Sequence, residues 1–177
     1  MDLECDRQET RNFYQQLRSR VQGLPGVQQV GMIDRLPLAP SFQISRFVPE
    51  GQQPEPGKEP ITQMRGVDHR FFETMGIPRR AGRLFDEKDE IADNQVIINE
   101  TMARSYFPDR SPLGQVIQNP HGNSVIVGVV RDVRNQGLDR EPKKQVYLPL
   151  HQNPVAGMAL VARAESDPLV VAGILQR

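Results

Sequence analysis

The chain has 177 residues, of which 37% are hydrophobic, and this length fits one large globular domain or two small ones. Its 22 basic and 22 acidic residues give a formal net charge of zero, which excludes a global field that would attract nucleic acid or anionic lipid. Cys5 is the only cysteine, so the chain can form neither an internal disulfide nor a cysteine-based metal site.

The first expected element is an amphipathic helix that ends near residue 24. Asp6 and Glu9 have the spacing of a capping box, in which the Glu9 side chain reaches back to the Asp6 amide. Gly23 and Pro25 end the element. A strand over 26–33 follows, and the apolar faces of both elements predict a helix packed on a sheet. The helical apolar positions are Phe13, Leu17, Val21 and Leu24.

Residues 34–60 form a proline-rich segment. Its prolines and glycines leave room for one short strand, Ile44–Val48. Because few apolar side chains anchor this segment, we predict that residues 37–60 are mobile and face a partner. The prolines are Pro37, Pro40, Pro49, Pro54, Pro56 and Pro60, and the anchoring side chains are Phe42, Ile44, Phe47 and Val48.

The middle of the chain opens with a strand over 61–67. Asp68 is placed to cap a short helix, and Gly76 suits the end of that helix. Residues 78–93 follow as a loop rich in charge. The apolar face of the short helix is formed by Phe71, Phe72 and Met75.

Strands and helices share the rest of the chain. A buried strand over 95–98 leads to Asn99, which is expected to cap a helix that Pro108 stops. A strand over 114–118 and a long strand over 124–134 are expected to form a hairpin, because residues 120–123 have turn chemistry. The last expected elements are strands over 146–148 and 158–163 and a helix that starts at Asp167-Pro168.

The apolar residues of the long strand predict a core and not a membrane span. The run from Val125 to Val130 is six residues long, whereas a membrane span needs about 20. The acidic start of the chain also lacks the apolar centre of a secretory signal. Since both faces of this strand are apolar, we predict one buried core formed by Ile98, Met102, Phe107, Val125, Val127 and Val129.

Neither the histidines nor the carboxylates have the spacing of a metal site. His69, His121 and His151 are far apart in sequence, and we expect three separate surface histidines. The acidic loop lacks the alternating ligands and turn glycine of a calcium loop. We expect it to be solvated, with carboxylates that cap a helix or pair with Arg79, Arg80 and Arg83. Its acidic residues are Asp86, Glu87, Asp89, Glu90 and Asp93.

The remaining candidates for chemistry also have structural explanations. Gly128 has no following glycine or helix for a phosphate site, so we expect a bend or a close backbone approach. Asp132 and Arg134 could be catalytic, but a polar strand end needs no such role. A ligand cage of Phe71, Phe72, Tyr106 and Phe107 is less favoured than helix core. We therefore predict no catalytic, cofactor-binding or metal residue.

Six short motifs occur in one order between residues 63 and 150. Together they resemble the periplasmic core domain of MacB/FtsX-type ABC transporter permeases, and especially the duplicated type with two such domains in one polypeptide. The turn at Leu24-Pro25-Gly26-Val27 and the segment Arg35-Leu36-Pro37-Leu38 fit as well. The motifs start at Val67-Asp68-His69-Arg70-Phe71-Phe72, Ala81-Gly82-Arg83-Leu84-Phe85, Val96-Ile97-Ile98-Asn99-Glu100, Ser111-Pro112-Leu113-Gly114, Val125-Ile126-Val127-Gly128 and Gln145-Val146-Tyr147-Leu148-Pro149.

The element order predicts an α+β fold in which both chain ends form one unit. The resemblance implies that residues 1–66 and 145–177 are a porter-like subdomain and that residues 67–144 are an inserted, strand-rich subdomain. It further implies a location on the periplasmic side of the bacterial inner membrane, between transmembrane helices of the same permease.

The resemblance also implies a non-enzymatic function without a cofactor, which couples ATP-driven conformational change to efflux or to periplasmic proteins. The implied partners are the rest of the permease with its second periplasmic domain, a separate ABC ATPase, and a periplasmic adaptor or lipoprotein; nucleic acid is not among them. The alternative is a soluble periplasmic module that binds a small ligand in a cleft between subdomains.

Overall fold

The structure is a computed structural model, and it describes residues 3–38, 43–51, 54–55, 60–89, 94–119, 122–134, 139–150 and 158–165. The helices are α1 (Leu3–Gln22), α2 (Phe71–Met75) and α3 (Glu100–Tyr106). The strands are β1 (Val27–Ile33), β2 (Gln43–Arg46), β3 (Val48–Pro49), β4 (Ile61–Val67), β5 (Arg79–Gly82), β6 (Gln95–Asn99), β7 (Val116–Asn119), β8 (Gly122–Val130), β9 (Gln145–Pro149) and β10 (Ala159–Ala164).

The strands pair in one continuous mixed sheet. Its order is β10-β1-β4-β9-β6-β8-β7-β3, with β2 added to β4 and β5 added to β8. The pairs β4–β9 and β6–β8 are parallel, and the other pairs are antiparallel. The predicted mixed α+β fold is therefore confirmed.

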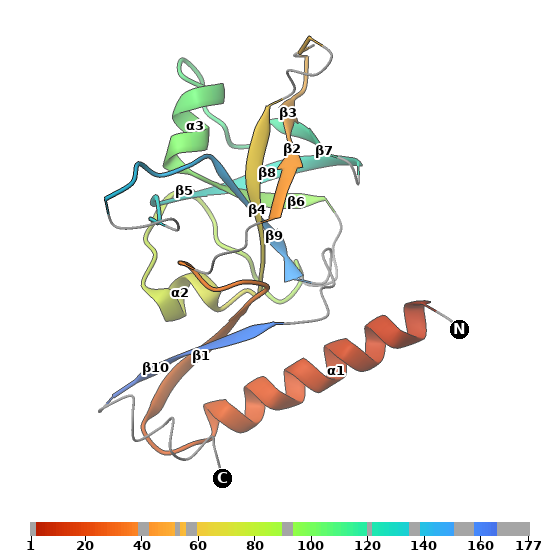
Figure 1. Cartoon of the computed structure of the whole chain (residues 1–177), viewed down its shortest axis with the longest axis vertical. Helices are drawn as coiled ribbons and strands as arrows, with labels where there is room; N and C mark the ends of the chain where they lie inside the picture. The colour runs from red at the N-terminus through yellow and green to blue at the C-terminus, as the bar shows by residue number, and fades with distance from the viewer. Residues whose placement is uncertain are drawn as a thin grey trace.

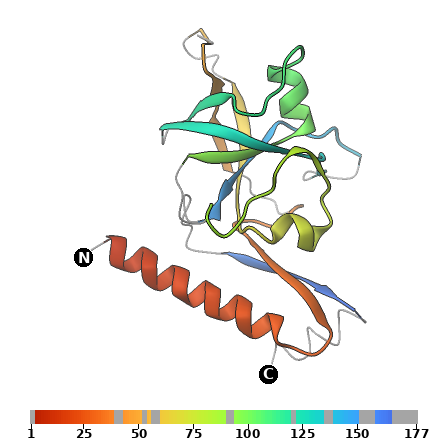
Figure 2. The ribbon, with the colours of Figure 1, turned by 180° about the vertical axis from the view of Figure 1, so that it is seen from behind.

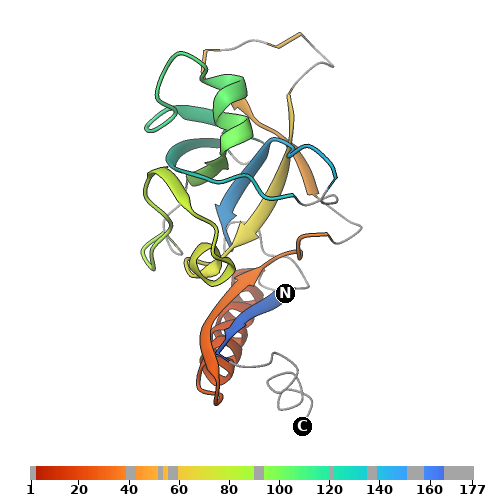
Figure 3. The same ribbon diagram turned by 90° about the vertical axis from the view of Figure 1, so that its left-hand side faces the viewer.

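Two parts of the molecule are visible along its long axis. α1, β1 and β10 lie at one end, and the strands β2 to β9 with α3 lie at the other (Figures 1 and 3). β1 pairs with β10 over most of its length but with β4 only through Ile33 and Val67. α2 lies between the two parts (Figures 1 and 2) and packs on β1 and β10.

The larger part has a core on each face of the sheet, because successive side chains of a strand point to opposite faces. The first core is covered by Met102 and Phe107 of the α3 segment. The second core is covered by Phe71 and Phe72 of α2. Strand residues of the first core include Met64, Val96, Ile98 and Val146, and those of the second include Val67, Ile97, Val130 and Tyr147.

Signals from neighbouring residues gave correct predictions for two helix ends and a hairpin. The Asn99 side chain accepts a hydrogen bond from Met102 N, as expected of a helix cap. Gly76 ends α2 in the left-handed conformation, with φ 67°. β7 and β8 pair as a hairpin, with Asn119 opposite Gly122. The expected helix at Asp167-Pro168 lies outside the described residues.

Three expectations were wrong because they missed pairing between distant residues. The proline-rich segment contains two strands, β2 and β3, since β4 and β7 offer pairing edges to them. The charged loop contains β5, which pairs with β8. Asp68 does not cap α2, whose first turn has no side-chain cap.

The predicted single core was also partly wrong. Val129, Ile98, Met102 and Phe107 do share the first core. Val127, however, packs against the second core, and Val125 is 39% exposed. Within the proline-rich segment, Phe47 is buried in the first core, whereas Ile44 is 54% exposed.

The proposed subdomain boundaries at residues 66 and 145 stay a prediction. In the described chain, β3 pairs with β7, and β9 pairs with both β4 and β6. Residues 48–49 and 145–149 therefore pair with strands of the middle segment, and β4 joins them through β9.

Candidate functional site

The contact between β1 and α2 joins the two parts of the molecule, and we call it the joint. Gly31 on β1 lies directly under the α2 backbone. A Cβ atom on Gly31 would come within 2.8 Å of Phe71 Cα and 3.1 Å of Thr74 Oγ1. Glycine in a strand commonly marks such a close backbone approach. Backbone therefore packs on backbone at the joint.

Asp68 connects three elements at the joint. Its Oδ1 accepts a hydrogen bond from Met32 N at 2.9 Å, and its Oδ2 accepts one from Arg18 Nη1 of α1 at 3.2 Å. The Asp68 amide donates to Met32 O at 3.1 Å. Burial raises the pKa of Asp68, and the hydrogen bonds from Met32 and Arg18 offset this only in part. The carboxylate thus holds α1, β1 and the start of α2 together.

Two further buried charged residues, Asp34 and Arg65, lie near Asp68. Asp34 follows β1, and its amide donates to Gly66 O at 2.9 Å. Arg65 on β4 is 1% exposed, and its Nε and Nη1 have no hydrogen-bond partner in the structure. Burial raises the pKa of Asp34 and lowers the pKa of Arg65, and their opposite charges oppose both shifts. Burial also raises the pKa of Tyr147, which lies opposite Arg65 in the register of β4 and β9.

Asp132 is part of a separate polar network that fixes α3 to the sheet. It accepts hydrogen bonds from Asn99 Nδ2 at 2.7 Å, from Thr101 N at 2.9 Å and from Arg104 Nη2 at 3.1 Å. Asn99 is fully buried and also accepts a hydrogen bond from Gln145 N at 3.0 Å. These contacts give Asp132 a structural role, because helix and strand ends need such acceptors.

Among the described residues of the acidic loop, Asp89 is buried, which differs from the expected solvated loop, but its pairing with Arg83 agrees with the expected pairing of the arginines with this loop. Asp89 is 1% exposed and accepts a hydrogen bond from Arg83 Nη2 at 2.8 Å. Arg83 also donates to Gln95. Burial alone would raise the pKa of Asp89, but the hydrogen bonds from Arg83 and Asp86 outweigh it and hold that pKa below its usual range. Of the other two arginines, Arg80 pairs with Glu100 at 3.0 Å.

Of the three histidines, the structure describes only His69. His69 Nε2 accepts a hydrogen bond from Arg70 Nε at 3.3 Å and lies 3.9 Å from Glu87 Oε1. His121 and His151 lie outside the described residues. Among the residues that are described, no group of three or more metal-ligating side chains occurs.

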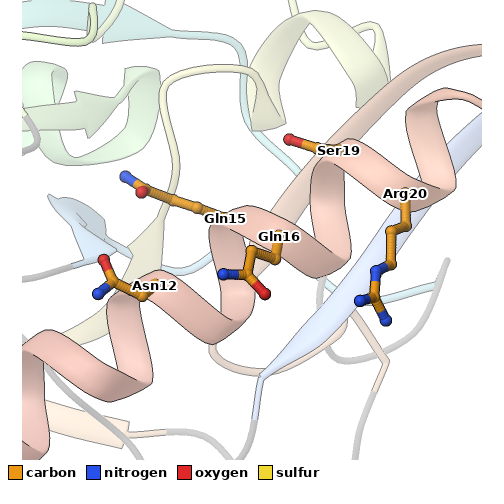
Figure 4. Close-up of a pocket in the computed structure, with 5 residues that line it drawn as sticks. All are labelled: Asn12, Gln15, Gln16, Ser19 and Arg20. Atoms are coloured by element: carbon orange, nitrogen blue, oxygen red, sulfur yellow. The ribbon is translucent and has the colours of Figure 1, made fainter.

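An open groove runs along the outer side of α1, away from the joint (Figure 4). It is lined by residues of a single helix. The lining residues are Asn12, Gln15, Gln16, Ser19 and Arg20. This groove differs from the concave pockets, built from several elements, that hold small molecules.

Sequence reasoning missed the joint. A signal was present at Gly31, since an isolated glycine inside a strand indicates close packing. The partners of Asp68 and Arg65, by contrast, lie on other elements and leave no local pattern.

Comparison with known proteins places the chain in a family. The family model for the MacB-like periplasmic core domain matches residues 8–174.

The chain belongs to the MacB-like periplasmic core domain family.

The MacB-like domain is similar to part of two macrolide export ATP-binding/permease proteins. It is 31% identical over 132 residues to MacB 1/2 of Paracoccus denitrificans, which is 67% of this chain and 20% of that protein. It is 38% identical over 88 residues to MacB of Bartonella quintana, which is 48% of this chain and 13% of that protein. The chain therefore corresponds to less than a quarter of either relative.

Solved structures show the same fold. The periplasmic region of MacB from Actinobacillus actinomycetemcomitans matches with a TM-score of 0.63 and 17% identity, covering 90% of this chain and 71% of that one. The extracellular domain of the transporter YknZ from Gram-positive bacteria matches with a TM-score of 0.60 and 17% identity, covering 88% and 74%. Within the described residues, no helix has the length and apolar character to cross a bilayer.

Proposed function

We propose that this MacB-like domain is the extracytoplasmic part of an ABC permease in the bacterial inner membrane. The domain is non-catalytic. It couples the conformational change that ATP drives to efflux or to a periplasmic partner protein. The observation that carries the proposal is the joint, where Gly31 lies against Phe71 and Asp68 is bonded to Met32 and Arg18. Close-packed contacts of this kind deform little, so movement of α1 would displace the rest of the domain.

The proposed partners follow from the relatives. Their names combine an ATP-binding part with a permease part. We propose that the domain works with transmembrane helices, a second periplasmic domain and a separate ABC ATPase, and that it contacts a periplasmic adaptor or lipoprotein.

The division into two subdomains is part of this proposal. The pairing of β1 with β10 supports a unit formed by both chain ends. The pairing of β3 with β7, and of β9 with both β4 and β6, supports a boundary near residue 34 over one at residue 66. The joint would then connect the terminal unit to the inserted one.

The alternative function, binding of a small ligand between the subdomains, has less support. The groove in Figure 4 lies along α1 and is lined by residues of that helix alone. A ligand that binds the folded domain would raise its melting temperature with concentration, which a thermal-shift screen measures.

The test of the coupling proposal weakens the joint in the complete permease with its ATPase. Gly31→Ala places a Cβ against the Phe71 backbone, whereas a Cβ at Gly23 meets only ordinary contacts at 3.6 Å. The readout is the ATP-dependent change in quenching of a fluorophore at Ser105, an exposed residue of α3, by a quencher attached to lipid. Replacement of Cys5, the only cysteine of the chain, and of every cysteine in the rest of the permease would keep the label specific.

We expect Gly31→Ala to retain ATP hydrolysis but to reduce the quenching change, while Gly23→Ala leaves both unchanged. A folded Gly31→Ala permease with a full quenching change would contradict the proposal, as would a wild-type permease that shows no ATP-dependent change.

A further inference from the structure

The polar network around Asp132 has a strongly basic outer side. Seven basic and three acidic side chains lie on the segments that meet there, residues 78–80, 100–104, 131–134 and 141–144. The chain as a whole has a formal net charge of zero, so this region is a local excess of positive charge. We call six of the basic side chains the basic patch; they are Arg79, Arg80, Arg104, Arg131, Lys143 and Lys144. Arg134 and the acidic residues Glu100, Asp132 and Glu141 lie on the same segments.

Backbone and side-chain contacts bring the segments of the basic patch together. Arg131 N donates to Pro78 O at 2.9 Å, which places the end of β8 beside the start of β5. Asn99 Nδ2 donates to Asp132 Oδ1 at 2.7 Å and to Lys143 O at 2.9 Å. The patch therefore surrounds the first turn of α3.

The two acidic side chains at the first turn of α3 are more covered than the arginines that engage them. Asp132 and Glu100 have side chains that are 14% and 26% exposed, and each is engaged by an arginine. Arg104 and Arg80 are 66% and 46% exposed. Glu141 is exposed. At the first turn of α3, solvent therefore meets mainly guanidinium groups.

Three further members of the patch are exposed and form no ion pair with a described residue: Arg79, Arg131 and Lys143. Of these, Arg79 donates a hydrogen bond from Nη1 to Gly82 O. Lys144 differs, because its Nζ lies 4.7 Å from the centre of the Tyr106 ring. The charges of Arg131 and Lys143 are thus available to a partner, and their loss should not unfold the domain.

The patch lies beside α3, at the end of the molecule opposite α1 and β10 (Figures 1 and 3). The proposed function passes movement through α1. The patch therefore lies at the far end of the domain from that helix.

We propose that the basic patch docks an acidic segment of an extracytoplasmic partner protein. Arginine binds carboxylates through two parallel hydrogen bonds, and complementary charge speeds association and selects the partner. This inference rests on the proposed function and adds to it the position and the charge of the partner surface.

The test uses the 177-residue chain and a fluorescein-labelled peptide of about ten glutamates, followed by fluorescence anisotropy at two salt concentrations. The patch variant is Arg131→Glu with Lys143→Glu. The matched control is Arg20→Glu with Lys88→Glu, because those residues are also exposed and the change in net charge is the same. A second probe is vesicles of phosphatidylglycerol and phosphatidylcholine.

We expect the peptide to bind the wild-type chain, with an affinity that falls at high salt. The patch variant should bind at least about tenfold more weakly and the control variant about as well as wild type. No peptide binding, an equal loss in both variants, or patch-dependent binding of vesicles without binding of the peptide would each overturn the proposal. The assay needs neither ATP nor the membrane part, so its failure is distinct from failure of the coupling proposal.

Discussion

Gly31 on β1 and Phe71 on α2 lie so close that a methyl group on Gly31 would come within 2.8 Å of Phe71 Cα. The nearest atoms belong to the backbone, which cannot move aside as a flexible side chain can. This contact sets how near the terminal helix and strand approach the rest of the domain.

The first prediction is that Gly31→Ala destabilises the isolated domain by about 1–3 kcal/mol, because the added methyl group overpacks the joint. Gly23→Ala, with its nearest contacts at 3.6 Å, should change the free energy of unfolding far less. Urea denaturation of both variants measures the difference. If Gly31→Ala and Gly23→Ala unfold at the same urea midpoint, the joint accommodates the added methyl group without a loss of stability.

The second prediction concerns the first core. Phe107 is 4% exposed, and Phe107→Ala should lower the free energy of unfolding by about 3–5 kcal/mol through lost burial and the cavity left behind. Phe13 is 60% exposed, so Phe13→Ala serves as the control and should have a small effect. If the two variants unfold at the same urea concentration, α3 does not contribute to the core.

The third prediction is a pH dependence at the joint. Burial raises the pKa of Asp68 above the ordinary value of about 3.9. The folded state then holds the proton more tightly than the unfolded chain. The contribution of Asp68 to stability is therefore complete below about pH 4 and declines as pH rises through the raised pKa.

Asp68→Asn removes this titration. The free energy of unfolding of the wild type, minus that of the variant, should fall as pH increases from about 4 upward. Urea unfolding at a series of pH values gives this difference. A difference that stays constant or grows over that range would contradict the prediction.

The fourth prediction has the opposite sign. The pKa of Asp89 lies below its usual range, so its contribution to stability is present above about pH 4 and is lost as pH falls through the lowered pKa. The stability of Asp89→Asn should therefore fall less than that of the wild type as the pH is lowered. Thermal unfolding below about pH 4 is the measurement. The same acid sensitivity in both proteins would show that the Arg83–Asp89 pair does not stabilise the fold.

Much of the fold could be predicted because local chemistry determines it. Asn99 and its partner Met102 are three residues apart, and the conformation of Gly76 needs only the end of α2. Strands such as β4 were predicted within their observed bounds for the same reason. In each case the signal and the structure that it forms lie within a few residues.

The joint could not be predicted in the same way. Asp68 has the position of a helix cap, but it bonds to Met32, 36 residues away, and to Arg18, 50 residues away. Val125 looks like a core residue in an apolar run, yet the pairing of β8 leaves it 39% exposed. Tertiary pairing decides such cases, and a single sequence does not show it.

The most direct test of the coupling account is a distance measured in the complete permease with its ATPase. One pair of spin labels, at Gln16 on α1 and Ser105 on α3, measures the distance between the two ends of the domain. A second pair, at Ser105 and on the membrane part of the permease, measures the distance between the domain and the membrane part. Both distances would be measured by pulsed electron paramagnetic resonance with ATP bound and with ADP bound. The account predicts that the distance between Gln16 and Ser105 stays the same while the distance from Ser105 to the membrane part changes. A change confined to the Gln16–Ser105 distance would mean that the joint yields, and would contradict the account.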